Sequence, residues 1–259
     1  MRRVLTAFVV AATCMLPLAP TLARAPVPPV KPLVSSKKPN WNMHISGRTV
    51  RVHAVTPDTP GPWPTVMLLH GASGLGDGYL IWPVARALAK RGIASAIVQY
   101  FDGLPDKIGR KGAVRYFGKR ENMLEQAVDQ LLRHPNVRGP AIGIYGYSLG
   151  GFHGLALAGT DNRISAVVSL AGALPRHVDG NELETAAPVL LVHGKRDRIV
   201  PYSRAEETVN AWQRHGRPVR LMSLPTAGHV PRGRERDRIV TASVDFLARN
   251  LALQIAQLP

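Results

Sequence analysis

The strongest chemical signal in the sequence is a serine between two glycines, in the pentapeptide Gly146-Tyr147-Ser148-Leu149-Gly150. An apolar segment precedes this G-x-S-x-G motif and a helical pattern follows it, which is the strand-turn-helix setting of a nucleophile elbow. The turn is so sharp that side chains two positions from the serine would clash, so glycines are needed there. The motif therefore predicts that Ser148 is presented as a nucleophile at the carboxyl end of a sheet.

A serine hydroxyl is a weak nucleophile without a base, and in this kind of site the chain order is serine, acid, histidine. Asp197 follows an expected strand that ends at His193, and His229 lies in the loop after the last expected strand. Each has an ordinary alternative: a loop salt bridge from Asp197 to Arg196 or Arg198, and a solvated surface position for His229. Because all three groups fall at strand ends in the right order, we predict that His229 is the general base and Asp197 orients it.

The elements that must position these groups alternate between apolar strands and amphipathic helices. Near-continuous apolar runs separated by helices are typical of a mostly parallel sheet with helices on both faces, so we expect the α/β class. The expected strands are 48–55, as an edge strand, 64–69, 93–100, 141–147, 164–170, 188–193 and 219–223, and the expected helices are 79–91, 113–133, 149–158, 203–215 and 235–253.

Residues 1–25 have the features of a secretory signal peptide. Two arginines follow the first methionine, residues 4–18 are almost uncharged, and Ala23-Arg24-Ala25 has the small-x-small pattern of a cleavage site. Pro17 and Pro20 interrupt the apolar run before it reaches the ~20 residues that a bilayer-spanning helix needs. We therefore expect cleavage after Ala25, export to the periplasm or the medium, and no stable membrane anchor after cleavage.

The rest of the chain is expected to form one catalytic domain. Prolines recur over residues 26–40 without a periodic apolar pattern, which predicts a linker, and 41–259 would be the domain. A chain of 259 residues is long enough for one large α/β domain and too short for two. The only cysteine, Cys14, lies in the expected signal, so no disulfide or cysteine nucleophile is expected in the mature chain.

On these motifs the chain resembles the α/β-hydrolase superfamily, and within it the dienelactone hydrolase-like serine esterases. The resemblance spans residues 48–253 and is carried by His70 to Leu75, the elbow at 146–151, His193 to Pro201, and Ala227-Gly228-His229. It implies an α/β-hydrolase fold. It also implies an oxyanion hole formed by the backbone N–H groups of Ala72 and Leu149. Only 171–187 separate two strands at the usual site of lid insertions, so no large lid is expected.

The expected reaction is hydrolysis of a small or mid-sized carboxylic ester through an acyl-enzyme intermediate. A typical dienelactone hydrolase has cysteine as nucleophile, and Ser148 at that position favours a general ester hydrolase. Basic side chains crowd the segment after strand 93–100. We interpret them as a solvated helix face, with binding of an anionic substrate as the alternative. They are Lys107, Arg110, Lys111, Arg115, Lys119 and Arg120.

No cofactor or metal ion is expected. The sequence has no Walker motif and no H-E-x-x-H, and His70, His153 and His193 are expected to pack or to bond within loops. The net charge of +16 is spread along the chain, which favours a solvated basic surface over a nucleic-acid partner. The oligomeric state cannot be predicted from the sequence.

Two other functions share some of these features. A peptidase of the prolyl-oligopeptidase type has the same elbow and triad order, but it normally carries a large extra domain. A catalytically silent binding protein of the same fold is disfavoured because all three catalytic groups are intact.

Overall fold

Eight strands form one sheet in the order β1-β2-β4-β3-β5-β6-β7-β8. The computed structural model describes residues 39–102, 104, 112, 115–178 and 180–256. The expected signal peptide and almost all of the expected linker lie outside the described residues. The strands are β1 Trp41–Ile45, β2 Arg48–Val55, β3 Thr65–Leu69, β4 Ala94–Val98, β5 Ile142–Tyr147, β6 Ile164–Leu170, β7 Val189–Gly194 and β8 Val219–Leu224.

The sheet is mostly parallel, as the sequence predicts. β2 pairs antiparallel with β1 and β4, while the pairings from β4 through β3 and β5 to β8 are all parallel. Every residue of β3, β4, β5, β6 and β7 is buried, because helices cover both faces of the central strands. This explains why these strands are continuous apolar runs in the sequence.

The expectation that 48–55 is an edge strand is wrong, because β1 pairs outside it. β1 alternates, with Met43 and Ile45 buried and Asn42 and His44 exposed. Ser46 and Gly47 join β1 to β2, both with positive φ, at 49° and 74°. Two consecutive residues with positive φ are typical of the tight turn that closes a β-hairpin.

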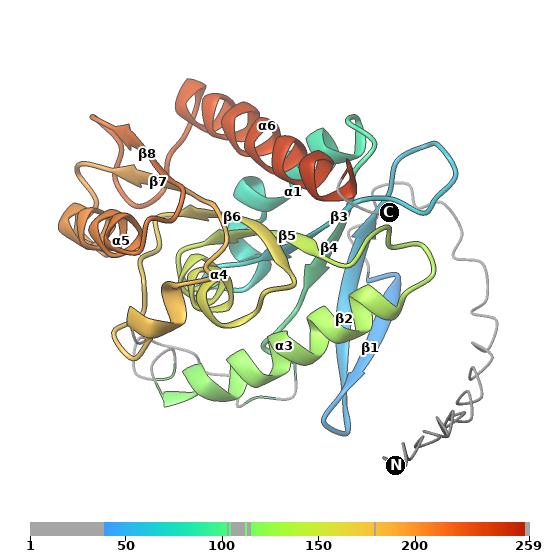
Figure 1. Cartoon of the computed structure of the whole chain (residues 1–259). Helices are drawn as coiled ribbons and strands as arrows, with labels where there is room; N and C mark the ends of the chain where they lie inside the picture. The colour runs from blue at the N-terminus through green and yellow to red at the C-terminus, as the bar shows by residue number, and fades with distance from the viewer. Residues whose placement is uncertain (1–38, 103, 105–111, 113–114, 179, 257–259) are drawn as a thin grey trace, which may run out of the picture.

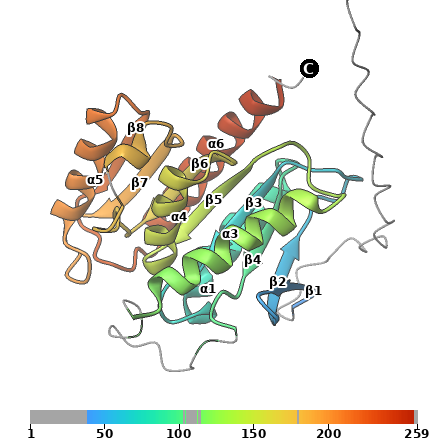
Figure 2. The same cartoon turned by 60° about the horizontal axis from the view of Figure 1, so that its bottom comes forward.

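The helices form two layers, one on each face of the sheet (Figures 1 and 2). α1 Gly78–Ala89 and α6 Arg234–Ala256 lie on one face, and α3 Phe117–Arg133, α4 Leu149–Thr160 and α5 Tyr202–Arg214 lie on the other. α6 is long and apolar enough to cross a membrane by length and composition. Its residues Val244, Leu247 and Leu251 are nevertheless buried in the cluster that it shares with α1 and the sheet.

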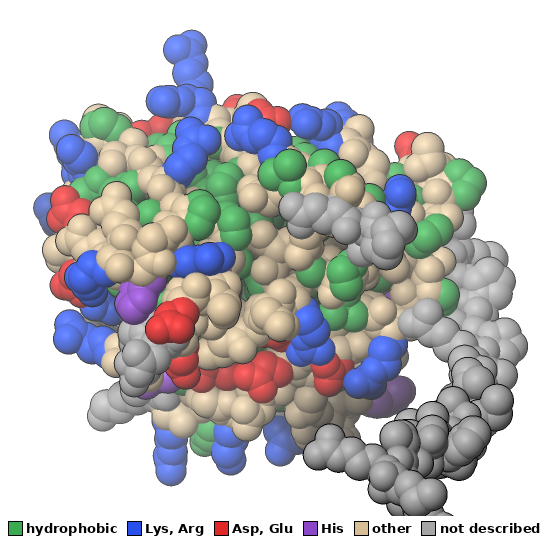
Figure 3. Space-filling model, viewed as in Figure 1, with side chains coloured by type: hydrophobic (Ala, Val, Ile, Leu, Met, Phe, Trp, Pro, Cys, Tyr) green, Lys and Arg blue, Asp and Glu red, His purple; other side chains and the backbone are tan. Residues whose placement is uncertain are grey.

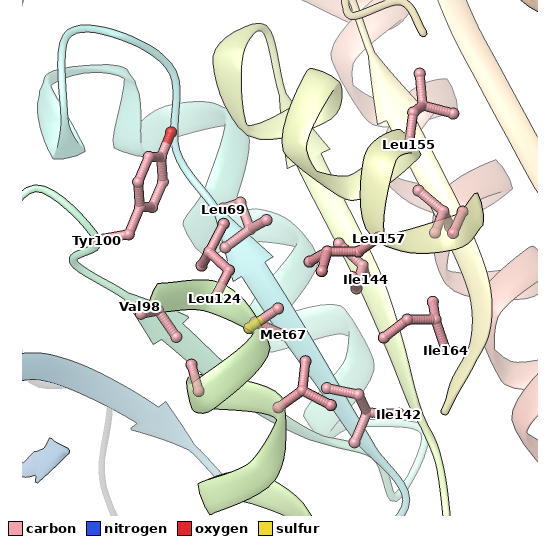
Figure 4. Packing of buried hydrophobic residues seen from close by; sticks show 14 of the residues in the cluster. Met67, Leu69, Val98, Tyr100, Leu124, Ile142, Ile144, Leu155, Leu157 and Ile164 are labelled. Atoms are coloured by element: carbon pink, nitrogen blue, oxygen red, sulfur yellow. The ribbon is translucent and has the colours of Figure 1, made fainter. Parts of the chain in front are cut away.

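The side chains on the two faces form two hydrophobic clusters. On the face of α3 and α4, Met67, Leu69 and Ile144 of the strands pack with Leu124 and Leu157 of the helices (Figure 4). Burial of each such side chain contributes about 1.5–3 kcal/mol to folding. These clusters fix the strands side by side, so that the loops at their carboxyl ends meet along one edge.

The fold is the α/β-hydrolase fold, and its lid region is short. Between β6 and β7 the described residues 171–178 and 180–187 contain only a short 3-10 helix, η2 Gly180–Leu183. A second 3-10 helix, η1 Leu75–Asp77, precedes α1. Lysine and arginine side chains are scattered over the visible surface, and acidic side chains gather in a band over α3 (Figure 3).

Candidate active site

The predicted elbow lies between β5 and α4. Ser148 follows the last residue of β5 and precedes the first residue of α4, with φ 50° and ψ −115°. Holding a non-glycine residue in this sparsely populated backbone conformation costs on the order of 1–3 kcal/mol of stability. Backbone strain of this kind is concentrated at functional sites. The N–H of Ser148 donates to the Leu170 carbonyl over 2.8 Å, which anchors the strained residue to β6.

The two glycines of the motif are required by close backbone approaches. A Cβ added to Gly146 would lie 2.2 Å from the carbonyl oxygen of Gly150. A Cβ added to Gly150 would lie 2.3 Å from the carbonyl oxygen of Leu69 in β3. Both contacts are with backbone atoms, which cannot move aside cheaply. The motif therefore holds α4 close against the ends of β3 and β5.

The structure brings Ser148, His229 and Asp197 together in one hydrogen-bonded chain. His229 Nε2 lies 2.9 Å from Ser148 Oγ, and His229 Nδ1 lies 2.8 Å from Asp197 Oδ2. A carboxylate only accepts hydrogen bonds, so Nδ1 carries the proton and Nε2 is free to accept one from the serine hydroxyl. This arrangement is the one that a general base beside a nucleophile needs.

Asp197 lies in the loop after β7, and its side chain is fully buried. Oδ1 accepts hydrogen bonds from the N–H groups of Ile199 and Val200, at 2.8 and 2.9 Å. Burial acts to raise the pKa of Asp197, but contacts with His193 and His229 and these two backbone amides outweigh it and lower the pKa below its ordinary value. The carboxylate is thus held ionised.

The ordinary alternatives for the acid and the histidine do not describe this site. Among the described residues, the ion pairs of Asp197 join it to His193 and His229 and not to the arginines beside it in the loop. The side chain of His229 is only 14% exposed. Its ring lies 5.5 Å from that of Tyr147, whose hydroxyl donates to the His229 carbonyl over 3.4 Å.

The two residues expected to form an oxyanion hole lie at the same edge of the sheet as Ser148. Leu149 is the first residue of α4, where the helix dipole favours negative charge. Leu69 of β3 pairs in register with Gly146 of β5, so the segments that follow both strands run side by side. Ala72 lies in the turn after β3, closed by the Gly74 N–H donating to the Gly71 carbonyl over 3.1 Å.

The remaining histidines named from the sequence pack as expected. His70 stacks on Tyr100 with ring centroids 4.3 Å apart, and the Tyr100 hydroxyl donates to the His70 carbonyl over 2.5 Å. His153 stacks on Phe117 at 4.0 Å. His193 contacts Asp197, a relation that spacing along the sequence does not reveal.

One of the basic residues predicted to lie on a solvated helix face is buried instead. Arg120 is completely buried, and its Nε donates to His153 Nε2 over 3.2 Å. Burial lowers the pKa of the Arg120 guanidinium, while nearby Tyr100 and Glu121 act in the opposite direction. The spacing to Met123 and Leu124 places Arg120 on the apolar stripe of α3, and this signal could have identified it.

The other members of that basic group are only partly described. Arg115 and Lys119 are exposed, and both lie over the Tyr116 ring, at 5.8 and 5.9 Å from its centroid. Lys107, Arg110 and Lys111 lie outside the described residues.

Comparison with curated proteins and solved structures places the chain among known hydrolases. It is 36% identical over 152 residues to the mitochondrial acyl-coenzyme A thioesterase 2 of Rattus norvegicus, which covers 56% of this chain and 30% of that protein. This chain therefore matches less than a third of the length of that relative.

Solved structures of the same fold match most of the chain. Est1E from Butyrivibrio proteoclasticus gives a TM-score of 0.66 at 17% identity, covering 82% of this chain and 99% of that one. A dienelactone hydrolase from Anabaena variabilis gives 0.63 at 20% identity, covering 83% and 96%. These likenesses show the fold.

The family model that matches this chain is that of the dienelactone hydrolase family, over residues 50–252. The match includes the elbow, the loop of Asp197 and the loop of His229. Together with the relatives, it supports hydrolase chemistry. The chain belongs to the dienelactone hydrolase family.

Proposed function

We propose that this chain is an exported serine hydrolase that cleaves carboxylic esters through Ser148, His229 and Asp197. The observation that carries the proposal is the pair of short contacts of the His229 ring, 2.9 Å to Ser148 Oγ and 2.8 Å to Asp197 Oδ2. Both contacts fall within hydrogen-bonding distance, so the serine and its base need no rearrangement before they act.

In this mechanism Ser148 Oγ attacks the ester carbonyl carbon while its proton passes to His229 Nε2. The buried carboxylate of Asp197 stabilises the imidazolium that forms, and the backbone N–H groups of Leu149 and Ala72 hold the oxyanion. Collapse of the tetrahedral intermediate expels the alcohol, which takes the proton from His229. A water molecule, activated by the same histidine, then attacks the acyl-enzyme and releases the acid.

Thioester hydrolysis is the second candidate, because the rat relative is an acyl-coenzyme A thioesterase. The same triad can expel a thiol in place of an alcohol. The intact hydrogen-bonded chain of the three groups disfavours a silent binding protein, and no described feature of the site favours a peptidase.

We also propose a substrate class, an open site and export of the protein. The substrate is a small or mid-sized ester, and exposed Arg115 and Lys119 are available to an anionic one. The short segment between β6 and β7 supports an open site. Export rests on the N-terminal pattern of residues 1–25, and sequencing the N-terminus of the protein recovered after expression tests cleavage after Ala25.

A panel of matched substrates tests the proposal. The purified protein is assayed with oxygen esters, thioesters and amides that share the same acyl groups, and Ser148→Ala serves as the control. We expect the highest kcat/KM with oxygen esters. Turnover of thioesters alone would reassign the leaving group. Turnover of amides alone would favour a peptidase, and activity that persists in the Ala variant would refute the role of Ser148.

A further inference from the structure

His193, the second-last residue of β7, contacts the carboxylate of Asp197. Its side chain is fully buried, and its Nε2 lies 2.8 Å from the Val200 carbonyl oxygen and 3.4 Å from Asp197 Oδ2. Both neighbours are oxygens that only accept, so Nε2 must carry a proton. The hydrogen bond to Val200 is the short one, and the contact with Asp197 is longer and assisted by its charge.

Val200 is therefore held on both sides. Its carbonyl accepts from His193, and its N–H donates to Asp197 Oδ1 over 2.9 Å. His193 thus reaches the carboxylate twice, directly at Oδ2 and through the backbone of Val200 at Oδ1. Loss of the imidazole would release both constraints on the rotamer of Asp197.

The surroundings of His193 fix its ring in this position. The Tyr202 ring packs edge-on against it, with centroids 6.0 Å apart and an angle of 77°, and the Tyr202 hydroxyl hydrogen-bonds Ser223 Oγ in β8. The loop that carries Asp197 also touches the loop of His229, because the Arg196 N–H donates to the Ala227 carbonyl over 3.0 Å. A shift of the Asp197 loop would therefore also displace the loop that carries His229.

We propose that His193 is a positioning residue, which holds Asp197 in the orientation that meets His229 Nδ1. This inference rests on the proposed function, since it gives Asp197 its role in the triad. The competing interpretation is that His193 only fills space in the core, in which case any side chain of similar volume would serve.

Two substitutions separate these interpretations. His193→Phe keeps an aromatic ring and removes the donor, whereas His193→Gln keeps an N–H that can reach Val200. We expect His193→Phe to lower kcat for a p-nitrophenyl ester about 10- to 100-fold with KM little changed, because a small misplacement of a catalytic group is costly. His193→Gln should restore most of the loss.

The same substitutions in an Asp197→Asn background test whether His193 acts through Asp197. Groups that act as a unit are strongly non-additive, so His193→Phe should cost little further activity there. An equal loss in both backgrounds, or equal losses for Phe and Gln, would overturn the proposal.

A measurement that needs no turnover keeps this inference separate from the proposed function. Proton exchange at His229 Nδ1 can be followed by NMR in the wild-type protein and in both variants. We expect a protected proton in the wild type and in His193→Gln, and faster exchange in His193→Phe. Unchanged protection in His193→Phe would overturn the role of His193, whereas a wild-type protein that cleaves none of the substrates would refute only the proposed function.

Discussion

Among the residues that the structure describes, two buried polar clusters each join a histidine to a charged side chain. At the sheet edge, Asp197 hydrogen-bonds one ring nitrogen of His229. The other ring nitrogen contacts Ser148, and the His229 side chain is partly exposed to solvent. Between α3 and α4, Arg120 donates to His153, which is completely buried and stacked on Phe117. A carboxylate orients an imidazole and leaves its second nitrogen basic, whereas an arginine uses that lone pair and leaves no base.

On the proposed function, we infer from this contrast that a buried charge beside a histidine does not by itself make a catalytic site. The sign of the charge and the access of the second ring nitrogen decide the outcome. Changes in the first cluster should therefore act mainly on activity, while changes in the second should act mainly on the free energy of unfolding.

The largest effect is expected for Ser148→Ala, which removes only the attacking oxygen. Loss of the nucleophile in a comparable triad lowers kcat by about a millionfold, and we expect a loss of that order here. Steady-state kinetics with a p-nitrophenyl ester and a thermal melt measure both sides of the contrast. A variant within tenfold of the wild type would remove Ser148 from the mechanism.

Asp197→Asn should lower kcat by about three to four orders of magnitude, because the amide favours the unproductive tautomer of His229. KM should change little. Asp102→Asn is the matched control, since the carboxylate of Asp102 is paired with Arg51 over 2.6 Å. If the control lost more activity than Asp197→Asn, the acid would have to be reassigned to the loop after β4.

Arg120→Met tests the second cluster. The methionine keeps much of the buried volume and removes the donor to His153, so we expect a loss of about 1–3 kcal/mol in the free energy of unfolding. The value of kcat should stay close to that of the wild type. Urea unfolding and ester kinetics on the same sample measure both quantities. A large loss of kcat with unchanged stability would contradict the proposed difference between the two clusters.

The smallest effect concerns pH. The pKa of Asp197 is lowered in the folded protein, so the unfolded chain binds this proton more readily, and stability falls as the pH falls. The contribution is fully present above the ordinary carboxyl pKa of about 3.9 and is lost as the pH falls through the folded value. The stability advantage of the wild type over Asp197→Asn should therefore shrink below about pH 4. Parallel curves of unfolding free energy against pH would contradict the shift.

Much of the sheet could be predicted from the sequence because its strands are buried on both faces. β6 runs from Ile164 to Leu170, as its apolar run predicts. β1 escaped prediction because it is a short, half-exposed strand whose place depends on pairing with β2. The charge of Arg120 predicts an exposed position, whereas its place on the apolar stripe of α3 predicts the buried position that the structure shows.

Some features of the candidate site could also be predicted from the sequence, and others could not. The order of Ser148, Asp197 and His229 along the chain indicated a triad, because parallel strands bring their carboxyl ends to one edge. The contacts of His193 with Val200 and Asp197 could not be predicted, since they depend on the path of the loop after β7. Spacing along the chain locates a loop, whereas the hydrogen bonds inside it follow from tertiary packing.

Covalent labelling tests the central claim most directly. The wild-type protein is treated with an organophosphonate, digested and analysed by mass spectrometry. The account predicts one adduct, on the peptide that contains Ser148, and strongly reduced labelling in Asp197→Asn because the histidine loses its orientation. An adduct on another serine, such as Ser73 or Ser169, or labelling that is unaffected by the loss of Asp197, would contradict it.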